Sequence, residues 1–532
     1  MDRIIRILLF LLPVISYIIA SRSLVHFLQL ESYQFPGCLR SYARNYKQIL
    51  SLCALTYVSI SVVYGLSSWI ATIAQPILVV VLITGFAVLN AYIAVLVQKL
   101  IFGVKQKKPL VYTMRVKRLY CMATVLFVSL SIAIGQIGVF YSFTILSLLL
   151  PVWVFLSAVL IWPLEKGICK LYECEAKRKL RAMPHLVKIG ITGSYGKTSV
   201  KHFLTTILSQ KYHVLVTPGS VNTLMGVTRV IRENLLPEHD VFIVEMGARH
   251  VGDIKKLCRL VQPAHGIITS IGPQHLETFK SIERIIQTKY ELILSLPIDG
   301  LSVFPNDQGV CRSLYDKSKQ PKQMVSVCGT DVINASHIRV TNNGSEFQLT
   351  LGEIVIPCQT KLLGRHHIQN ILIAAAMAHH LGIEPEQIVS GIAHLQPVEH
   401  RLQIIPTANN ITVIDDTFNS NPTGASMALE VLKSFSARRI IVTPGMVELG
   451  NIEDECNHAF GKEMAQTADI AIIIGKKHAD PIVEGLLEGG FSINNIHRVQ
   501  SLEESTEVIK TITQAGDVIL YENDLTDNYN AV

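Results

Sequence analysis

The sequence predicts an α/β protein preceded by an N-terminal multi-span helical membrane domain. Three observations support this prediction. Apolar runs of membrane-spanning length gather in the first third of the 532 residues. From about residue 184 onward, short β-branched runs alternate with helical patterns, which is typical of a parallel sheet covered by helices. A glycine-rich turn joins the first of these strands to a helix. A chain of this length is expected to contain about three domains.

The apolar runs of the first third predict about five membrane spans. A helix needs roughly 20 apolar residues to cross a hydrocarbon layer of ~30 Å. The four strongest runs are residues 48–70, 74–98, 119–141 and 142–163. Residues 4–20 form a weaker fifth run, interrupted by Pro13. No small-residue cleavage site is evident after it, so we do not interpret it as a signal peptide.

The distribution of charge predicts the orientation of these spans. Five spans place residues 21–47, residues 99–118 and the segment after residue 163 on one side, and all three segments are rich in Lys and Arg. The opposite loops are short and nearly uncharged. The positive-inside rule makes the basic side cytoplasmic. We therefore expect a multi-pass protein of the inner cell membrane in which the domains from residue 184 onward face the cytoplasm.

The overall composition agrees with this interpretation. Hydrophobic residues make up 49% of the chain, charged residues 17%, and the formal net charge is +7. The basic residues cluster next to the predicted spans, where they favour the anionic headgroups of a lipid bilayer. Basic residues interleaved with aromatic ones are absent, so we do not expect a nucleic-acid partner.

The remaining residues predict two α/β domains after a basic linker. Strands are expected at 186–191, 213–216, 241–244, 266–269 and 301–304, then at 411–414, 439–443, 470–474 and 518–521. Residues 330–360 suggest a β-hairpin with Asn342-Asn343-Gly344 at its turn, and residues 366–381 suggest a helix. The expected domains are a transmembrane domain (1–165), a juxtamembrane linker (166–184), a central P-loop ATP-binding domain (185–395) and a C-terminal Rossmann-like domain (396–532).

The turn between the first strand and its helix reads Gly193-Ser-Tyr-Gly-Lys-Thr-Ser199. Such a turn presents backbone N–H groups and the positive end of the helix dipole to a phosphate. The amine of Lys197 can reach the terminal phosphates, and the hydroxyl of Thr198 can ligate Mg²⁺. We therefore predict a nucleoside triphosphate with Mg²⁺, and the family resemblance described next implies that the cofactor is ATP. The predicted loop contacts to ATP are Gly193, Ser194, Gly196, Lys197, Thr198 and Ser199.

The spacing of this loop differs from that of the common phosphate loop, which has a glycine at the position of Ile191. The shorter loop resembles that of the Mur ligase family, the ATP-dependent amide-bond ligases of cell-wall (peptidoglycan) synthesis. The resemblance extends over about residues 185–520. It is nearest to the branch of that family that adds D-Ala-D-Ala to a muramoyl peptide.

Three further motifs of that branch would supply the metal site. In Val244-Glu-Met-Gly-Ala-Arg-His250, the resemblance implies that Glu245 helps to hold Mg²⁺, as a carboxylate at a strand end beside the loop can do. In Ile271-Gly-Pro-Gln-His-Leu-Glu277, it implies that His275 binds a second magnesium ion. Lys289 stands where the family has a lysine that carries a carbamate, an anion able to hold a divalent ion. With Thr198, these residues form the predicted magnesium set.

The same resemblance assigns residues to the nucleotide and to the incoming amine. Asn306 and Asn370, the latter in Gly364-Arg-His-His-Ile-Gln-Asn370, would approach the adenine, and Arg401 would reach the phosphates with its planar donors. In Asp415-Asp-Thr-Phe-Asn-Ser-Asn-Pro422, Asp416 would lie near the ribose, and Asn419 and Asn421 would line the amine site. The predicted catalytic residues are Lys197, His275, Lys289 and Arg401.

Two departures from the family leave the substrates open. Membrane helices take the place of the domain that grips the UDP-sugar. Near the C-terminus, the family branch has a basic Lys-Gly-Ser-Arg type segment, but this chain has the acidic residues Glu522, Asp524 and Asp527. These acids either favour a cationic amine or only cap the fold.

The leading hypothesis is therefore a membrane-anchored, ADP-forming ligase. It would join a cell-envelope precursor carboxylate to an amino acid or dipeptide amine through an acyl phosphate. The alternatives are a D-Ala-D-Ala-adding ligase with a soluble UDP-linked substrate, a polyglutamate-type ligase, and a non-catalytic ATP-binding membrane scaffold.

Overall fold

The computed structural model describes residues 2–31, 33–73, 76–102, 109–135, 148–327, 329, 331–341, 344–407, 410–418, 420–475 and 478–524, and the statements below concern these residues. They form two compact units, one built on Met1–Lys170 and the other on Leu171–Leu525.

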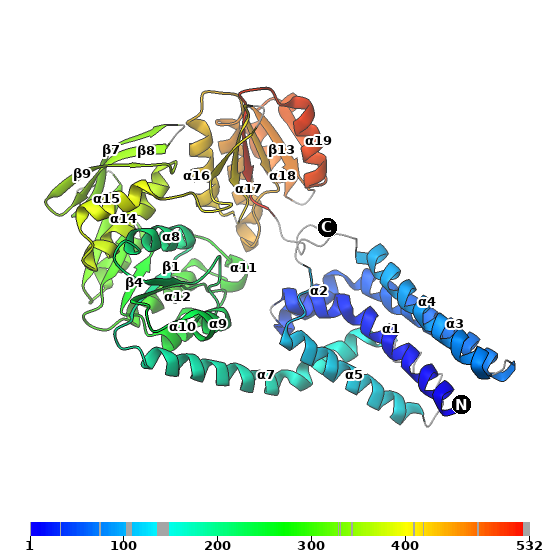
Figure 1. Ribbon diagram of the computed structural model, residues 1–532. Coiled ribbons are helices and arrows are strands. Elements are labelled where there is room, and N and C mark those ends of the chain that lie inside the picture. The colour runs from blue at the N-terminus through cyan, green and yellow to red at the C-terminus, as the bar shows by residue number, and fades with distance from the viewer. Residues whose placement is uncertain are drawn as a thin grey trace. The chain divides into compact units, whose positions relative to one another are not determined.

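The first unit consists of helices (Figure 1). They are α1 (Asp2–Leu30), α2 (Phe35–Arg44), α3 (Tyr46–Ile73), α4 (Pro76–Phe102), α5 (Met114–Gly135) and the first part of α7 (Leu150–Arg181). Their shared core contains the stacked rings of Tyr17 and Phe127, whose centroids are 4.1 Å apart. A partly buried charge pair lies within the same unit. Arg118 donates from Nε and Nη2 to the two carboxylate oxygens of Glu165, at 2.5 and 2.9 Å.

Each predicted span falls within or overlaps one of these helices, although residues 136–147 lie outside the described part of the chain. Two helices in the described residues, Ile77–Phe102 and Leu150–Arg181, are long and apolar enough to cross a membrane. Val14–Leu30 is apolar but shorter. The five-span topology therefore remains a prediction.

The segment predicted as a basic linker is largely helical, because α7 continues to Arg181. Residues 166–181 contain a single glycine and are otherwise mostly good helix formers. The last turns of α7 also pack in the second unit, where Ala176 and Leu180 are buried. Glu175 forms an ion pair with Arg232 at 2.7 Å there.

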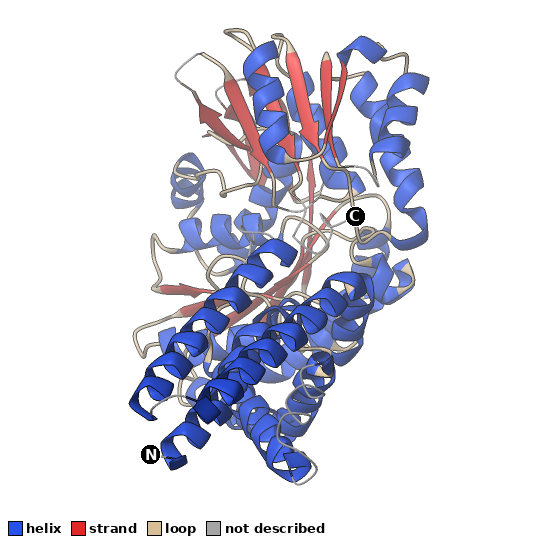
Figure 2. Cartoon of the chain, turned by 90° about the vertical axis from the view of Figure 1, so that its right-hand side faces the viewer, coloured by secondary structure: helices blue, strands red, loops and turns tan. Residues whose placement is uncertain are grey.

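The second unit contains two sheets with helices on their faces (Figure 2). Among the described residues, the first sheet has nine strands in the order β2-β3-β1-β4-β5-β6-β7-β8-β9. All neighbours are parallel except β7-β8 and β8-β9. These strands are β1 (Val187–Thr192), β2 (Val214–Val216), β3 (Val241–Glu245), β4 (His265–Ile268), β5 (Ser302–Pro305), β6 (Lys322–Val327), β7 (Ile333–Thr341), β8 (Gly344–Leu351) and β9 (Ile354–Thr360).

The second sheet follows later in the chain. Its described strands have the order β10-β11-β15-β12-β13-β14, and only the pair β10-β11 is antiparallel. They are β10 (Gln403–Pro406), β11 (Thr412–Asp416), β12 (Arg439–Thr443), β13 (Ile470–Ile474), β14 (Ile496–Val499) and β15 (Val518–Glu522). The α/β prediction is confirmed, and both sheets are mixed.

Alternation along the strands explains why helices cover both faces of the first sheet. Val241 and Ile243 of β3 belong to one core, whereas Phe242 and Val244 belong to the other. Successive side chains of a strand point to opposite faces, so an apolar strand needs helices on both sides. The helices of this sheet are α8 (Lys197–Leu208), α9 (Leu224–Asn234), α10 (Asp253–Val261), α11 (Leu276–Phe279), α12 (Ile282–Leu294), α13 (Val310–Lys317), α14 (Arg365–His380) and α15 (Pro385–Ala393).

The second sheet shows the same alternation. Ile441 of β12 faces one core, and its neighbours Ile440 and Val442 face the other. Its helices are α16 (Pro422–Lys433), α17 (Glu453–Ala465), α18 (Ala479–Glu488) and α19 (Leu502–Ile512), with the short 3₁₀ turns η1 (Gly450–Ile452) and η2 (Ile493–Asn495).

Candidate active site

The predicted phosphate loop lies between the carboxyl end of β1 and the N-terminus of α8. Gly196 precedes α8 with a left-handed φ of 78°, and a Cβ there would come within 2.7 Å of Asn370 Oδ1. Glycine is therefore required at this position. The end of β4 holds the loop from the other side. Ser194 exchanges hydrogen bonds with the backbone of Gly272, and Ser270 Oγ accepts the N–H of Tyr195 at 2.8 Å.

The amine of Lys197 is folded over this loop. Its Nζ donates to the carbonyl oxygens of Gly193 and Ser194, at 2.7 and 3.1 Å. Burial lowers the pKa of Lys197 to about 8, with Glu245 opposing the shift and Arg401 adding to it. A phosphate oxygen placed at the loop would be a stronger acceptor than a carbonyl, because its charge would also favour the ammonium form.

Glu245 is the centre of a hydrogen-bonded cluster at the end of β3, next to β1. Its Oε2 accepts from Thr198 Oγ1 and from Lys201 Nζ, both at 3.0 Å, and its Oε1 accepts from Asn222 at 3.0 Å. Burial by itself would raise the pKa of Glu245, but Lys201, Lys197 and these hydrogen bonds lower it below its usual value. The carboxylate is therefore ionised beside the loop hydroxyl, and this pair of oxygen donors suits a magnesium ion bound to phosphate.

Lys289, the predicted carbamate residue, also reaches the loop. Its side chain comes from α12 and its Nζ donates to Gly193 O at 2.7 Å, so it shares an acceptor with Lys197. Burial, with a contribution from Lys197, holds the pKa of Lys289 well below its usual range. A neutral amine is the form that reacts with carbon dioxide, so the environment suits the predicted carbamate.

His275, the other predicted magnesium ligand, has a protein partner. Its Nδ1 bonds to a carboxylate oxygen of Glu448, which lies in the loop after β12. Burial lowers the pKa of His275, and Glu448 opposes the shift. In the part of the chain that the structure describes, no group of three His, Cys, Asp or Glu residues could hold a metal ion by itself. Magnesium usually keeps several waters and phosphate oxygens, so one or two protein ligands suffice.

The residues predicted to contact adenine lie in two places. Asn370 lies against Gly196, at the loop. Asn306 instead donates to Asp331 Oδ2 at 2.8 Å. His366 has both ring nitrogens buried without a hydrogen-bond partner, next to the ring of His367 with the centroids 4.1 Å apart.

Arg401 connects the two sheets. Its Nη2 donates to Thr198 Oγ1 at 3.2 Å, and its guanidinium lies 4.3 Å from the ring centre of Phe418. Burial raises the pKa of Asp416 to about 7, although Arg401 and the N–H of Leu402 oppose the shift. The structure therefore brings Arg401 to the loop, with Asp416 beside it.

Of the two residues predicted to line the amine site, one caps a helix and the other lies outside the residues that the structure describes. Asn421 caps α16, with its Oδ1 accepting the N–H of Gly424 at 3.0 Å. Asn419 lies outside the described residues. Glu522, at the end of β15, is 1% exposed and accepts hydrogen bonds from the hydroxyls of Ser420 and Thr443. Burial raises the pKa of Glu522 to about 7.

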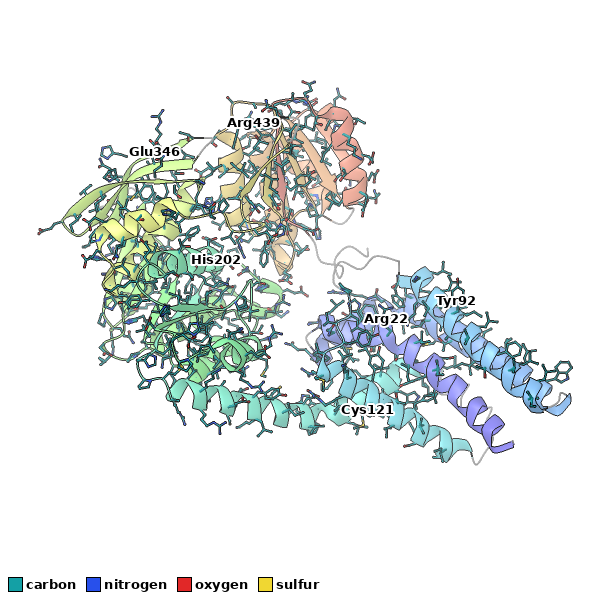
Figure 3. The ribbon with its side chains drawn as sticks, viewed as in Figure 1. Arg22, Tyr92, Cys121, His202, Glu346 and Arg439 are labelled. Carbon is teal, nitrogen blue, oxygen red and sulfur yellow. The ribbon has the colours of Figure 1, made fainter. Side chains whose placement is uncertain are left out.

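Sequence analysis did not identify Lys201, Asn222 or Glu448. Lys201 had a usable signal, because it follows Lys197 by four residues and so lies on the same face of α8. Asn222 and Glu448 come from distant loops, and their roles depend on tertiary contacts; the Gly445–Gly450 segment that contains Glu448 resembles the family but does not by itself assign a role to Glu448. Figure 3 labels His202, the residue that follows Lys201 on α8.

Comparison with known proteins assigns a family domain to the region of each sheet. The Mur ligase middle domain matches residues 191–378, and the Mur ligase glutamate ligase domain matches residues 400–521. The chain is 33% identical over 306 residues to the UDP-N-acetylmuramoyl-tripeptide–D-alanyl-D-alanine ligase of Escherichia coli, which covers 56% of this chain and 67% of that protein. The ligase of the same name from Bacillus subtilis is 28% identical over 339 residues. This match covers 63% of this chain and 72% of the Bacillus subtilis protein.

Solved structures agree with these matches. The crystal structure of MurF from Acinetobacter baumannii superposes with a TM-score of 0.62 and 26% identity, covering 68% of this chain and 78% of that one. MurF ligase from Thermotoga maritima in complex with ADP has the same fold, with a TM-score of 0.61 at 22% identity.

Proposed function

Because this chain belongs to the Mur ligase family of ATP-dependent, ADP-forming amide ligases, we propose that it joins D-alanyl-D-alanine to a UDP-linked muramoyl tripeptide. The observation that best supports this substrate pair is the 33% identity to a ligase named for it. The sequence had favoured a membrane-associated precursor, with the UDP-linked substrate as the alternative. The names of the relatives favour the alternative.

The chemistry follows from the residues at the loop. The substrate carboxylate attacks the γ-phosphate of ATP and releases ADP, and the amine then attacks the acyl phosphate and releases phosphate. Two anions repel each other in the first step. Lys197, the loop N–H groups and Arg401 would reduce this repulsion because they direct positive charge and donors at the phosphates. Thr198 and Glu245 would hold Mg²⁺, which supplies further charge neutralisation when bound.

Two further assignments belong to this proposal. Lys289 would act as a carbamate, since its amine is buried beside Gly193 and Lys197. His275 would turn its remaining ring nitrogen toward a second magnesium ion. The matched family regions fall within the proposed central domain (185–395) and the proposed C-terminal domain (396–532).

We further propose that the N-terminal unit (1–165) lies in the lipid bilayer with the catalytic domains on the cytoplasmic side. Support comes from composition, since no Asp, Glu, Lys, Arg or His occurs in residues 48–98 or 119–164. The helix α4 exposes large apolar side chains, among them Ile77 (73%), Leu100 (76%) and Tyr92 (65%), the last labelled in Figure 3. Soluble proteins rarely expose apolar surfaces of this extent.

A product assay tests the proposed function. The full chain, purified in detergent, is supplied with ATP, Mg²⁺, UDP-linked muramoyl tripeptide and D-alanyl-D-alanine, and the product is identified by mass spectrometry. We expect the amide product together with one ADP per turnover. Lys197→Ala should abolish product formation, whereas Lys256→Ala, at an exposed lysine paired with Asp253, should not. ATP turnover that needs membrane lipid extract in place of the UDP-linked peptide would contradict the proposed substrate.

A further inference from the structure

The pairing of His275 with Glu448 joins two loops that are distant in sequence. His275 precedes α11 and follows β4 of the first sheet, whereas Glu448 lies between β12 of the second sheet and η1. The imidazole Nδ1 bonds to Glu448 Oε2, and the backbone N–H of Glu277 donates to the carbonyl oxygen of Glu448 at 3.2 Å. Arg249 approaches the other carboxylate oxygen of Glu448 at 3.8 Å.

The backbone at this contact is specialised. His275 has φ of 54° and Glu448 has φ of 65°, both in the left-handed region that non-glycine residues rarely adopt. The two side chains are 21% and 23% exposed, so water competes only partly for the bond. The side-chain bond between these two residues and the backbone bond from Glu277 to Glu448 together form a specific contact between the sheets.

The chemistry of the pair determines which nitrogen of His275 is available. An ionised carboxylate can only accept a hydrogen bond, so Nδ1 must be the donor. Nε2 is then the nitrogen available to a ligand. Where a histidine binds a metal, a carboxylate on its other nitrogen fixes the tautomer and the ring orientation, and removing that carboxylate typically lowers metal affinity 10- to 100-fold.

We propose that Glu448, from the second sheet, is a positioning residue that orients His275, beside the first sheet, for a divalent cation. This inference rests on the proposed magnesium role of His275. It adds that the cation site is completed from the second sheet, although Glu448 itself does not touch the cation. Binding of the cation and formation of this contact between the sheets therefore favour each other, as linkage requires.

The test compares Glu448→Ala with Glu448→Gln and with a matched control. The amide oxygen of glutamine can still accept from Nδ1, so Gln should partly rescue what Ala loses. The control is Glu488→Ala, because Glu488 accepts from His458 at 3.2 Å and from Lys462 at 2.6 Å within the second-sheet domain alone. All variants are full chains in detergent, with thermal unfolding measured to confirm that they fold.

Two readouts report on the two parts of the proposal. The first is the Mg²⁺ concentration that gives half-maximal binding of a fluorescent ATP analogue, which Glu448→Ala should raise about 10-fold or more. The second is hydrogen exchange of the peptide containing the Glu277 amide, which should become faster in Glu448→Ala when nucleotide and Mg²⁺ are bound. Glu488→Ala should change neither readout.

Each contrary result overturns a defined part. An unchanged Mg²⁺ requirement in folded Glu448→Ala overturns the positioning role, and unchanged exchange at Glu277 overturns the coupling to the contact between the sheets. Neither readout needs the muramoyl or amine substrate. Failure of this inference is therefore distinguishable from failure of the proposed function, which the product assay detects.

Discussion

At the scale of single residues, the pair of Lys201 and Glu245 is a fully buried ion pair. Their side chains are 0% and 2% exposed, and the charged atoms are 3.0 Å apart. Removing two charges from water is costly, so such a pair needs good geometry and further hydrogen bonds. Thr198, Asn222 and the carbonyl of Gly219 supply these bonds. We infer that Lys201 holds Glu245 in place for the loop.

Replacing Lys201 with methionine should leave the carboxylate of Glu245 buried without its main cation. We expect the free energy of unfolding to fall by about 3–5 kcal/mol, as for other buried pairs that lose one partner. The double variant Lys201→Met, Glu245→Gln should recover part of this loss, because no charge is then left unpaired. Denaturant unfolding measures both, and equal stability of Lys201→Met and the unmodified protein would contradict the assignment.

The buried carboxyl of Glu522 predicts a pH dependence of stability. Its pKa is about 7 in the folded protein, against a usual value of 4.5. The unfolded chain releases this proton first, so stability from this group is present below about pH 4.5 and is lost as pH rises toward 7. The loss amounts to roughly 3 kcal/mol for a shift of this size.

Glu522→Gln should therefore make the decline in stability between pH 5 and pH 7 less steep. A smaller decline should remain, because the raised pKa of Asp416 makes stability depend on pH in the same range. Thermal unfolding at several pH values measures this, and Asn421→Ala, which removes only a helix cap, should keep the slope of the unmodified protein. A variant Glu522→Gln with an unaltered slope would show that the carboxyl is ionised throughout.

The relative positions of the candidate residues follow from the sequence where a local motif determines the geometry. Lys197 and Thr198 follow the glycine turn, and Glu245 ends a strand in register with Ile191 of β1, so the three are adjacent in any parallel sheet of this order. Asn421 shows the limit. The sequence Asn-Pro at this position matches the family motif, but it is also typical of an ordinary helix N-cap. The sequence alone therefore does not show whether the Asn421 side chain binds a ligand or caps the helix by accepting the N–H of Gly424.

At the scale of elements, α17 and α18 pack through glycines. A Cβ at Gly461 would lie 2.2 Å from the carbonyl oxygen of Ile482, and one at Gly485 would lie 2.0 Å from that of His458. These distances are far below van der Waals contact, so the two helix backbones approach each other as closely as only glycine permits.

Gly485→Ala should destabilise the protein by about 1–3 kcal/mol, since a methyl group overpacks this contact. Helix propensity alone predicts that Gly485→Ala stabilises the protein, because alanine is favoured over glycine in a helix by about 1 kcal/mol. Gly167→Ala provides the matched control, because Gly167 is also helical but has open space where its Cβ would be. Stabilisation by Gly485→Ala would contradict the packing.

Element-level prediction was accurate for apolar strands and weaker elsewhere. The strands at 439–443 and 470–474 are confirmed at their predicted bounds. The strands β6, β10 and β14 were not predicted. β10 and β14 are the edges of their sheet and contain polar residues or proline, so their pairing depends on the neighbouring strand rather than on their own pattern.

At the scale of the whole molecule, the composition of the N-terminal unit predicts that the protein stays in the membrane fraction, which the composition of the catalytic sheets does not predict. If its charge-free helices lie in a bilayer, the protein should remain in the membrane pellet after extraction with alkaline carbonate and should dissolve only in detergent. Release into the carbonate supernatant would contradict insertion. Trypsin added to sealed inverted vesicles should cleave the chain after residue 171, because the catalytic domains are then outside.

The central claim is that the chain forms an amide through an acyl phosphate made at the Gly193–Ser199 loop. The most direct measurement uses a muramoyl tripeptide whose reacting carboxylate carries oxygen-18. An acyl phosphate transfers one of these oxygens to the phosphate that is released, so we predict one labelled oxygen per phosphate, with the signal absent in Lys197→Ala. Phosphate whose new oxygen comes entirely from water would show simple ATP hydrolysis and would contradict the claim.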